Sequence, residues 1–406
     1  MQPQPSGNHE TSNARLRAGF ACCVLLPSTG TVQKYLGLWG VICYLLLGFC
    51  GVIVFRRLLV APLSSLKQRQ IILLSISTLL VLLCLCLVLY PKAQAGVIGG
   101  GSDADDALNI AANELVHGRY PYYPRTYLDN QISPMPGAVI LALPFVWLSS
   151  SAYQNIFWLA VFLYLARRHL DSAAEALALF WAVLCLSPLV LQNLVTGTDY
   201  LANSIYVAAF MYWMIRSIKE GKTSTWQKVT AAVLVGIGLS SRATFIACLP
   251  LTFSALLQNA GWKPAVKYTL LTVASLGAIT IPFWLWAPHA FTPLTQQTKK
   301  VAEYGSVLPH SGLIISGVTI LISVALSFQR MDGRQMVWFR NCALVQAFPV
   351  LCVVALASLN SGRLNFIYSS YGMFALFFGA LGFWQNAKRG SSPTVNEGSD
   401  CQLSPP

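Results

Sequence analysis

The sequence predicts an all-α fold, a polytopic bundle of transmembrane helices, and two features of its composition lead to this prediction. Only 10% of the 406 residues are charged, whereas soluble proteins carry about 25%. Charge is costly in lipid, so a share this low is typical of membrane proteins. Apolar runs of about 20 residues, the length that crosses a bilayer as a helix, stand at residues 35–55 and 71–90.

The order of the apolar runs predicts about 11 spans when charge is also considered. Further runs occupy residues 173–192, 200–215, 268–287, 312–328, 342–359 and 365–384. Two longer runs would each measure about 44 Å as a straight helix, against a bilayer core of about 30 Å. We expect the first, residues 138–166, to keep 138–147 at the outer face and to cross with 152–166. We expect the second, residues 229–257, to be a hairpin that turns at residues 240–242.

This arrangement places most of the 27 Lys and Arg residues, together with the C-terminus, on one side of the membrane. The positive-inside rule identifies that side as the cytoplasm, so we expect a multi-pass integral protein of the cell inner or plasma membrane. The net charge of +13 follows from these loops. No basic patch interleaves with aromatic residues outside the spans, so nucleic acid is not an expected partner. Nearly all of the 11 cysteines lie in apolar runs and predict no disulfide framework.

The chain divides into three parts. Residues 1–34 are polar apart from one short apolar patch, so we expect an N-terminal tail or a weak extra helix. Residues 35–387 form the transmembrane domain, in which residues 91–151 are the longest extracytoplasmic loop. Residues 388–406 are polar and rich in Pro and Ser, which predicts a disordered cytoplasmic tail.

The long outer loop contains the densest acidic cluster of the chain, Asp103, Asp105 and Asp106. Residues 107–117 follow with apolar side chains at i, i+3, i+4 and i+7, which predicts a short amphipathic helix lying in the membrane interface. Gly118 is placed to end this helix. One carboxylate is enough to cap a helix, and three are present, so a catalytic role and a structural role have about equal weight.

Two later loops add charged residues on the same face. Asp199 lies in the short outer loop at residues 193–199, and Arg242 lies at the tip of the expected hairpin, at the level of the outer headgroups. A guanidinium can bind two phosphate oxygens in one plane, which makes Arg242 a candidate phosphate ligand. The sequence is equally consistent with an Arg242 side chain that extends to the surface and binds no ligand.

These residues resemble the GT-C superfamily of membrane glycosyltransferases, in particular its mannosyltransferase-like members. In that family the first large outer loop begins with acidic residues, and a short amphipathic helix, a G-x-x-P-Y-like element and a proline-containing run follow in order. The corresponding elements here are the three aspartates, residues 107–117, Gly118 to Tyr122, and SPMPGAVILALPF from Ser133. The resemblance covers about residues 71–260 and is one of arrangement more than of strict motif.

The resemblance implies transfer of a sugar from a polyprenyl-phosphate donor to a lipid or glycan acceptor hydroxyl at the outer face, among membrane lipids. One aspartate would act as general base. Asp105 and Asp106 are preferred because they open the helix, and Asp103 also fits. The implied substrate-binding residues are Arg242, Asp199, Tyr120, Tyr122 and His117, although the last three also suit a purely interfacial role. No cofactor is certain, and the paired carboxylates are compatible with a divalent cation.

Two other classes of protein compete with this interpretation. A transporter would carry ionisable residues at the midplane of its spans, often in repeated halves, and the spans here are nearly free of charge. A non-catalytic membrane subunit could bind a partner through residues 91–151, and the sequence does not separate this alternative from an enzyme.

Overall fold

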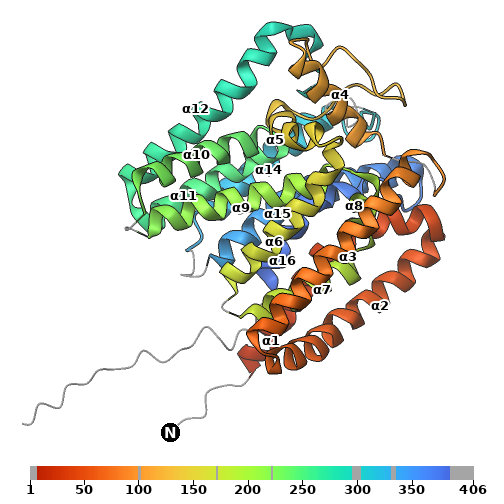
Figure 1. The fold of residues 1–406 in the computed structure, drawn as a ribbon, viewed down its shortest axis with the longest axis vertical. Helices are drawn as coiled ribbons and strands as arrows, with labels where there is room; N and C mark the ends of the chain where they lie inside the picture. Colours follow the sequence, from red (N-terminus) through yellow and green to blue (C-terminus); the bar gives the residue numbers. More distant parts are fainter. Residues whose placement is uncertain are drawn as a thin grey trace, which may run out of the picture.

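The computed structural model describes residues 7–98, 102–170, 172–220, 223–294, 303–330 and 335–384 (Figure 1). Throughout these residues the fold is helical, and no strand occurs among them. The longer helices are α1 (Gly7–Leu25), α2 (Thr29–Ser65), α3 (Gln68–Gln94), α4 (Ala104–Val116), α5 (Pro136–Trp147), α6 (Gln154–His169), α7 (Ala173–Leu186), α8 (Pro188–Thr196), α9 (Tyr200–Lys219), α10 (Thr225–Leu239), α11 (Leu249–Ala260), α12 (Trp262–Trp286), α14 (Ser311–Ser327), α15 (Met336–Ser361) and α16 (Met373–Phe383).

Several of these helices are long and apolar enough to cross a membrane. Within the described residues five segments meet the requirement: residues 13–65, Gln68–Gln94, Ala243–Ala260, Trp262–Trp286 and Met336–Ser361. The number rises to seven if two bent helix pairs are each counted as one span. The prediction of an all-α, membrane-embedded bundle is therefore confirmed, but the expected count of about 11 spans is not.

The shortfall comes from helices that are short or polar for a span. In the described part of the chain, α14 has 17 residues and α7 has 14, so neither reaches the length of about 20 that a full crossing needs. α9 has 20 residues, but it carries Asn203, Ser204 and two basic residues in its last turn. α7 and α9 are largely buried by their neighbours, so their composition follows the bundle core instead of lipid.

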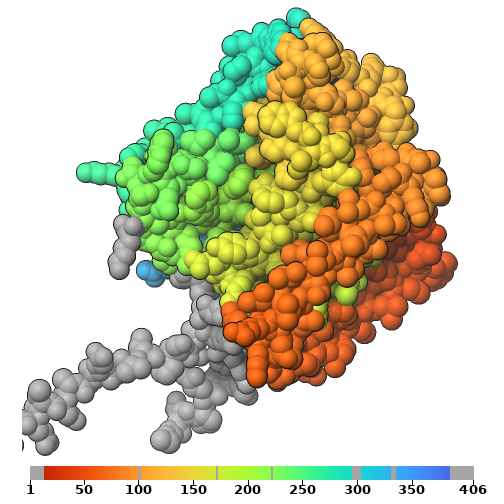
Figure 2. Space-filling model, in the orientation of Figure 1, coloured from red at the N-terminus to blue at the C-terminus, as the bar shows by residue number. Residues whose placement is uncertain are grey.

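The faces of α2 and α3 that point away from the bundle are strongly apolar. Leu46, Leu47 and Leu58 on α2, and Leu73 on α3, each expose more than half of their side-chain surface. These two helices lie together along one flank of the molecule, where they form a continuous surface (Figures 1 and 2). An exposed apolar surface of this extent is what a lipid-facing flank requires.

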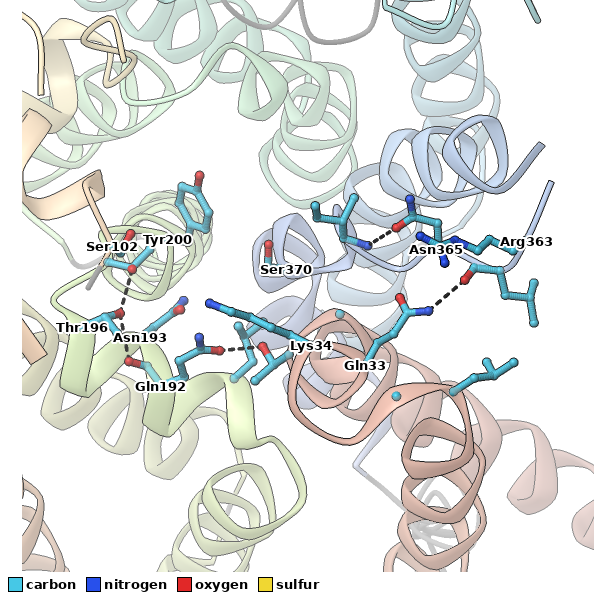
Figure 3. A pocket seen from close by; sticks show the side chains of 18 residues that line it. Gln33, Lys34, Ser102, Gln192, Asn193, Thr196, Tyr200, Arg363, Asn365 and Ser370 are labelled. Atoms are coloured by element: carbon cyan, nitrogen blue, oxygen red, sulfur yellow. Dashed lines mark hydrogen bonds between the residues drawn. The ribbon is translucent and has the colours of Figure 1, made fainter. Parts of the chain in front are cut away.

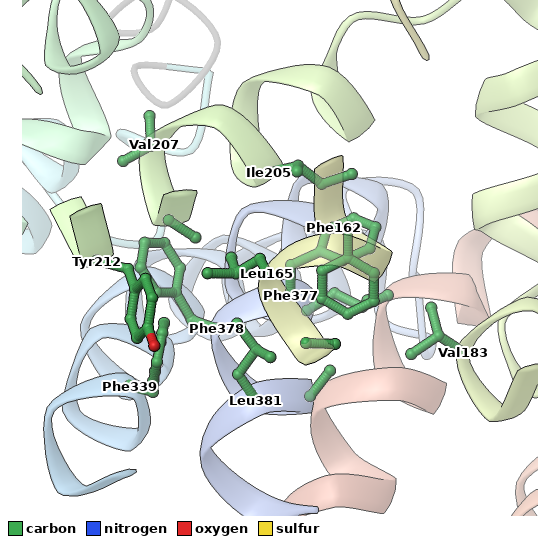
Figure 4. Close-up of a cluster of buried hydrophobic side chains, with 14 of the residues drawn as sticks. Phe162, Leu165, Val183, Ile205, Val207, Tyr212, Phe339, Phe377, Phe378 and Leu381 are labelled. Atoms are coloured by element: carbon green, nitrogen blue, oxygen red, sulfur yellow. The ribbon is translucent and has the colours of Figure 1, made fainter. Parts of the chain in front are cut away.

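The centre of the bundle is filled by aromatic and aliphatic side chains of α6, α9, α15 and α16 (Figure 4). The ring of Phe162 on α6 meets that of Phe377 on α16 edge to face, with 4.7 Å between the ring centroids. Nearby, Tyr212 on α9 stacks on Phe339 of α15 at 6.0 Å. These contacts fix the helices that carry the loops described below.

Residues 7–25, within the segment expected as a tail or a weak extra helix, form α1. Phe20, Val24 and Leu25 are buried, and the Phe20 ring packs against that of Trp384 with centroids 5.1 Å apart. α1 is thus part of the bundle beside α16. Residues 388–406, predicted to be a disordered tail, lie outside the described residues.

The two long apolar runs are both broken, as expected. α5 and α6 meet at 101°, so residues 136–147 do not continue the direction of α6. The second run breaks at Ser240–Arg242, between α10 and a short 3-10 helix, Ala243–Cys248, that leads into α11. This second break lies against the start of α5, because the Met135 and Gly137 amides donate to the carbonyl oxygens of Ser241 and Ser240 at 3.2 and 3.0 Å.

Candidate functional site

The acidic cluster opens α4, at the end of the bundle that carries residues 102–151, called the loop end below (Figure 1). α4 begins at Ala104, three residues before the expected start at residue 107, so Asp105 and Asp106 lie in its first turn and Asp103 is its N-cap residue. Carboxylates at this position favour the helix dipole. Gly118, with φ of +69°, follows the last turn, as expected for a helix end.

Two of the three aspartates hold the turn at residues 126–130. Asp103 accepts hydrogen bonds from the Thr126 hydroxyl at 2.9 Å and from the Asn130 amide at 2.7 Å. Asp106 accepts one from the backbone amide of Tyr127 at 3.0 Å. These bonds explain the size of the cluster in part, since each carboxylate has its own structural partner.

Asp105 differs from its two neighbours because it is buried, with only 1% of its surface exposed. Its Oδ2 accepts hydrogen bonds from the Tyr90 hydroxyl at 2.8 Å and from the Gln94 amide, whereas its Oδ1 has no partner among the described residues. Burial raises the pKa of the Asp105 carboxyl to about 6, although the hydrogen bond from Tyr90 favours the ionised form. A carboxyl group that titrates near neutral pH is suited to proton transfer.

Asp105 lies directly behind the turn at residues 196–198. Gly197 in this turn has φ of +73°, and a Cβ atom built there would lie 3.1 Å from the Asp105 Cβ and 2.9 Å from the Tyr90 ring. The glycine therefore allows both a left-handed backbone and a close approach. Its neighbours, Thr196 and Thr198, line a large cavity on the other side of the turn.

This loop-end cavity has a volume of about 920 Å³ and is mostly polar near its centre (Figure 3). Lys34 points across it toward Asn193, while Arg363 and Asn365 approach from the segment before α16 (Figure 3). The cavity is lined by Gly30, Thr31, Gln33, Lys34, Gly37, Leu38, Ser102, Leu189, Gln192, Asn193, Thr196, Thr198, Tyr200, Arg363, Leu364, Asn365, Ile367 and Ser370. Two cationic side chains and no carboxylate stand among these residues, so the lining of the cavity carries a net positive charge.

A second cavity of about 300 Å³ lies on the other side of the segment at residues 367–371. Ile367 and Ser370 face the loop-end cavity, whereas Tyr368 and Tyr371 line this second, apolar cavity. Its walls come from Leu294, Ile315, Pro349, Val350, Val353 and Phe374, among others. A polar cavity and an apolar one are thus separated by a single short segment of chain.

Arg242 is buried, with 3% of its surface exposed, so its side chain does not extend to the surface of the bundle. Its Nη2 donates to both carboxylate oxygens of Asp199, at 2.8 and 2.6 Å, and its Nη1 donates to the Ser133 hydroxyl at 3.3 Å. The guanidinium also lies over the ring of Tyr200, 5.2 Å from its centroid. The structure therefore brings Asp199 and Arg242 together, but neither side chain lines the loop-end cavity.

The three remaining candidates lie apart from that cavity. Tyr120 and Tyr122 are buried beside α12, where the Tyr120 hydroxyl donates to the carbonyl oxygens of Phe283 and Ala287. His117 is exposed, and its Nδ1 lies 2.7 Å from the Asn113 carbonyl oxygen. Of the three, only His117 is exposed as an interfacial role requires, whereas the two tyrosines pack inside the protein.

The structure also identifies polar residues that the sequence analysis passed over, chiefly Lys34, Gln192 and Asn193. Lys34 belongs to the segment expected as an N-terminal tail. The alternation of loops across the membrane places that segment on the same face as Asp105, and this is the signal that could have identified Lys34.

In the described part of the chain, no group of three or more His, Cys, Asp or Glu side chains is close enough to hold a metal ion, so no ligands can be named for the divalent cation considered above.

Comparison with known proteins adds no relative. No family model, no curated protein and no solved structure matches the chain.

Proposed function

We propose that the chain is a membrane glycosyltransferase that moves a sugar from a polyprenyl-phosphate donor to an acceptor hydroxyl in the loop-end cavity. One observation carries the proposal: a carboxyl group with a pKa raised to about 6 lies directly behind the wall of a large cavity that contains two cationic side chains. General acid-base chemistry and binding of a phosphate leaving group need these two features side by side.

The donor fits the two neighbouring cavities. Its phosphate would lie beside the Lys34 amino group, and Arg363 would add positive charge from the other side of the cavity, so both stabilise the negative charge that develops as the leaving group departs. Its apolar chain would pass the segment at residues 367–371 into the apolar cavity beyond Tyr371. The sugar would then face Asn193, Gln192 and the 196–198 turn, whose amide and hydroxyl groups can hydrogen-bond to hydroxyls.

Asp105 is the proposed general base. Its carboxylate accepts the proton of the acceptor hydroxyl, whose oxygen bonds to the anomeric carbon while the bond to the phosphate oxygen breaks and the phosphate keeps the electron pair. The 196–198 turn separates Asp105 from the cavity, so the proposal includes a movement of this turn when substrate binds. Gly197, at φ of +73°, is the residue about which such a movement can occur.

Arg242 and Asp199 have a positioning role in this proposal. Asp199 neutralises the charge of Arg242. The phosphate is therefore assigned to Lys34 and Arg363 instead of Arg242. The pair joins the residue before α9 to the break before α11 and, through Ser133, to the segment that leads into α5. It therefore holds three segments around the loop-end cavity.

The test combines donor binding and transfer in the purified full chain. Lys34→Gln with Arg363→Gln should weaken binding of the polyprenyl-phosphate sugar, whereas Lys92→Gln with Arg125→Gln removes the same charge from the loop end outside the cavity and should not. Transfer of the labelled sugar to an acceptor should follow the same order. Equal donor binding in both double variants would contradict the placement of the phosphate. Donor binding without transfer by the unaltered chain would instead favour a non-catalytic subunit.

A further inference from the structure

The end of the bundle opposite the loop end contains a cavity that the proposed function does not use. It has a volume of about 350 Å³ and lies between α1 and α2, where α7 begins and α16 ends. This is the end that the positive-inside rule assigns to the cytoplasm. The cavity, called the arginine cavity below, is lined by Asn13, Arg17, Phe20, Val52, Ile53, Arg56, Arg57, Val60, Ala61, Glu175, Phe383 and Trp384.

Charge in this cavity is strongly unbalanced. Three arginines, Arg17, Arg56 and Arg57, face a single carboxylate, that of Glu175. No ion pair or hydrogen bond joins Arg17 or Arg57 to another residue in the described part of the chain. Cationic loops on the cytoplasmic side explain why arginines are present, but they do not explain why side chains from two different helices converge on one hollow.

Aromatic packing holds the arginine cavity in place. The guanidinium of Arg56 lies over the ring of Trp384, 5.5 Å from its centroid, and Trp384 itself packs on Phe20 with ring centroids 5.1 Å apart. Trp384 and Phe20 are 3% and 2% exposed, so both are fixed in the bundle. Arg17 and Arg57 are exposed beside this packed wall, and a bound anion would reduce the repulsion among the like charges of the three arginines.

We propose that the arginine cavity binds a phosphate group. Arginine forks match the oxygens of phosphate in pairs, and three guanidiniums can together neutralise and hydrogen-bond one such group. A volume of about 350 Å³ is within the range of small-ligand sites. Basic pockets between transmembrane helices on the cytoplasmic side are suited to the headgroups of anionic lipids.

The walls of the cavity indicate how a lipid would be oriented. Val52, Val60 and Ile53 line it from α2, and the neighbouring Val54 and Leu58 expose about half or more of their side chains on the same helix. An acyl chain could therefore lie along α2 while the phosphate lies among the arginines. Free phosphate has the same charged group and lacks the chains, so an experiment can separate the two sources. This inference does not depend on the proposed transfer reaction.

The test measures lipid binding to the purified full chain by native mass spectrometry and the shift in unfolding temperature that each ligand causes. The ligands are phosphatidylglycerol, phosphatidylcholine and inorganic phosphate. Arg17→Gln with Arg57→Gln should weaken phosphatidylglycerol binding by at least about tenfold, because two charge-assisted contacts are lost. Arg15→Gln with Arg69→Gln is the matched control, since both residues are exposed arginines outside the cavity.

The results separate the sources and can overturn the proposal. Stabilisation by phosphatidylglycerol, but not by phosphatidylcholine or inorganic phosphate, identifies a lipid headgroup site. Equal stabilisation by inorganic phosphate identifies a site for the free ion. No binding of either anion, or an equal loss in both double variants, overturns the proposal. If the Gln variant does not fold, Arg17→Lys with Arg57→Lys replaces it, because it keeps the charges, removes the forks and should still bind more weakly than the control.

Discussion

The Nη2 atom of Arg242 donates to both carboxylate oxygens of Asp199, at 2.8 and 2.6 Å, and the two side chains are 4% and 0% exposed. The residues are 43 positions apart in the chain. A buried pair with this geometry depends on both partners, because either charge alone would be left without compensation in an apolar interior.

The first prediction concerns this pair. Asp199→Ala should destabilise the protein by about 3–5 kcal/mol, since it leaves the Arg242 guanidinium buried and unpaired. The measurement is chemical or thermal unfolding in detergent. Arg125→Ala is the control: it breaks an exposed pair with Asp129 and should cost about 0–1 kcal/mol. Similar losses of unfolding free energy in the two variants would show that burial does not increase the contribution of the Asp199–Arg242 pair to stability.

The second prediction concerns transfer by Asp105. Asp105→Asn should lower the rate of sugar transfer by about a hundredfold to ten-thousandfold, which is the usual effect of losing a general base. Asp103→Asn and Asp106→Asn should affect it less, since their carboxylates hold the turn at residues 126–130 and an amide oxygen can still accept those bonds. A full rate in Asp105→Asn would remove this residue from the reaction, and donor binding measured alongside would show whether the cavity is intact.

The third prediction concerns stability and pH. The pKa of Asp105 is raised from 3.8 to about 6, so its contribution to stability is fully present below about pH 4 and is lost as pH rises through about 6. A shift of this size corresponds to about 3 kcal/mol. Asp105→Asn should therefore raise the unfolding temperature at pH 7.5 and leave it nearly unchanged at pH 4. Asp106→Asn should show no such gain at either pH, and an equal gain there would point to a general charge effect.

The fourth prediction concerns the contact between the start of α5 and the end of α10. A Cβ atom at Gly137 would lie 2.1 Å from the Ile237 carbonyl oxygen and 2.8 Å from the Ser240 carbonyl carbon. Gly137→Ala should thus separate α5 from α10 and lower the unfolding temperature. Gly317→Ala on α14, where no atom lies within 4 Å, should be neutral or slightly stabilising. Retained stability in Gly137→Ala would mean that the two helices do not need this close approach.

The fifth prediction concerns topology. Single cysteines at Leu128 and Ser64, both exposed positions, should react with a membrane-impermeant maleimide from opposite sides. The parent chain without these substitutions reports labelling of its own cysteines. Reaction of both positions from the same side would contradict the assignment of residues 91–151 to the outer face.

Much of the fold could be predicted from local sequence. Length showed that residues 138–166 and 229–257 are each too long for one straight span, and the distribution of basic residues then favoured a break in both. The number of spans could not be predicted in the same way. Burial by other helices lets α9 carry polar residues and lets α7 remain short, and such burial depends on contacts far apart in the chain.

The candidate site was predictable only in part. The apolar periodicity of residues 107–117 located α4, but three aspartates in four positions give no sign of which one is buried. That difference comes from Tyr90 and Gly197, which approach Asp105 from other segments. The pairing of Asp199 with Arg242 could not be inferred either, because the outer-loop assignment placed both residues on one face without fixing their separation.

The contact between the start of α5 and the second break also affects how the protein is made. The Met135 and Gly137 amides find their acceptors at Ser241 and Ser240, about a hundred residues further along the chain. At about 5–20 residues per second, the ribosome needs about 5–20 s to supply those carbonyl groups. Until then these two amides lack the acceptors that they have in the folded protein. The loop end is therefore completed after the middle of the chain has been synthesised, although its own residues emerge early.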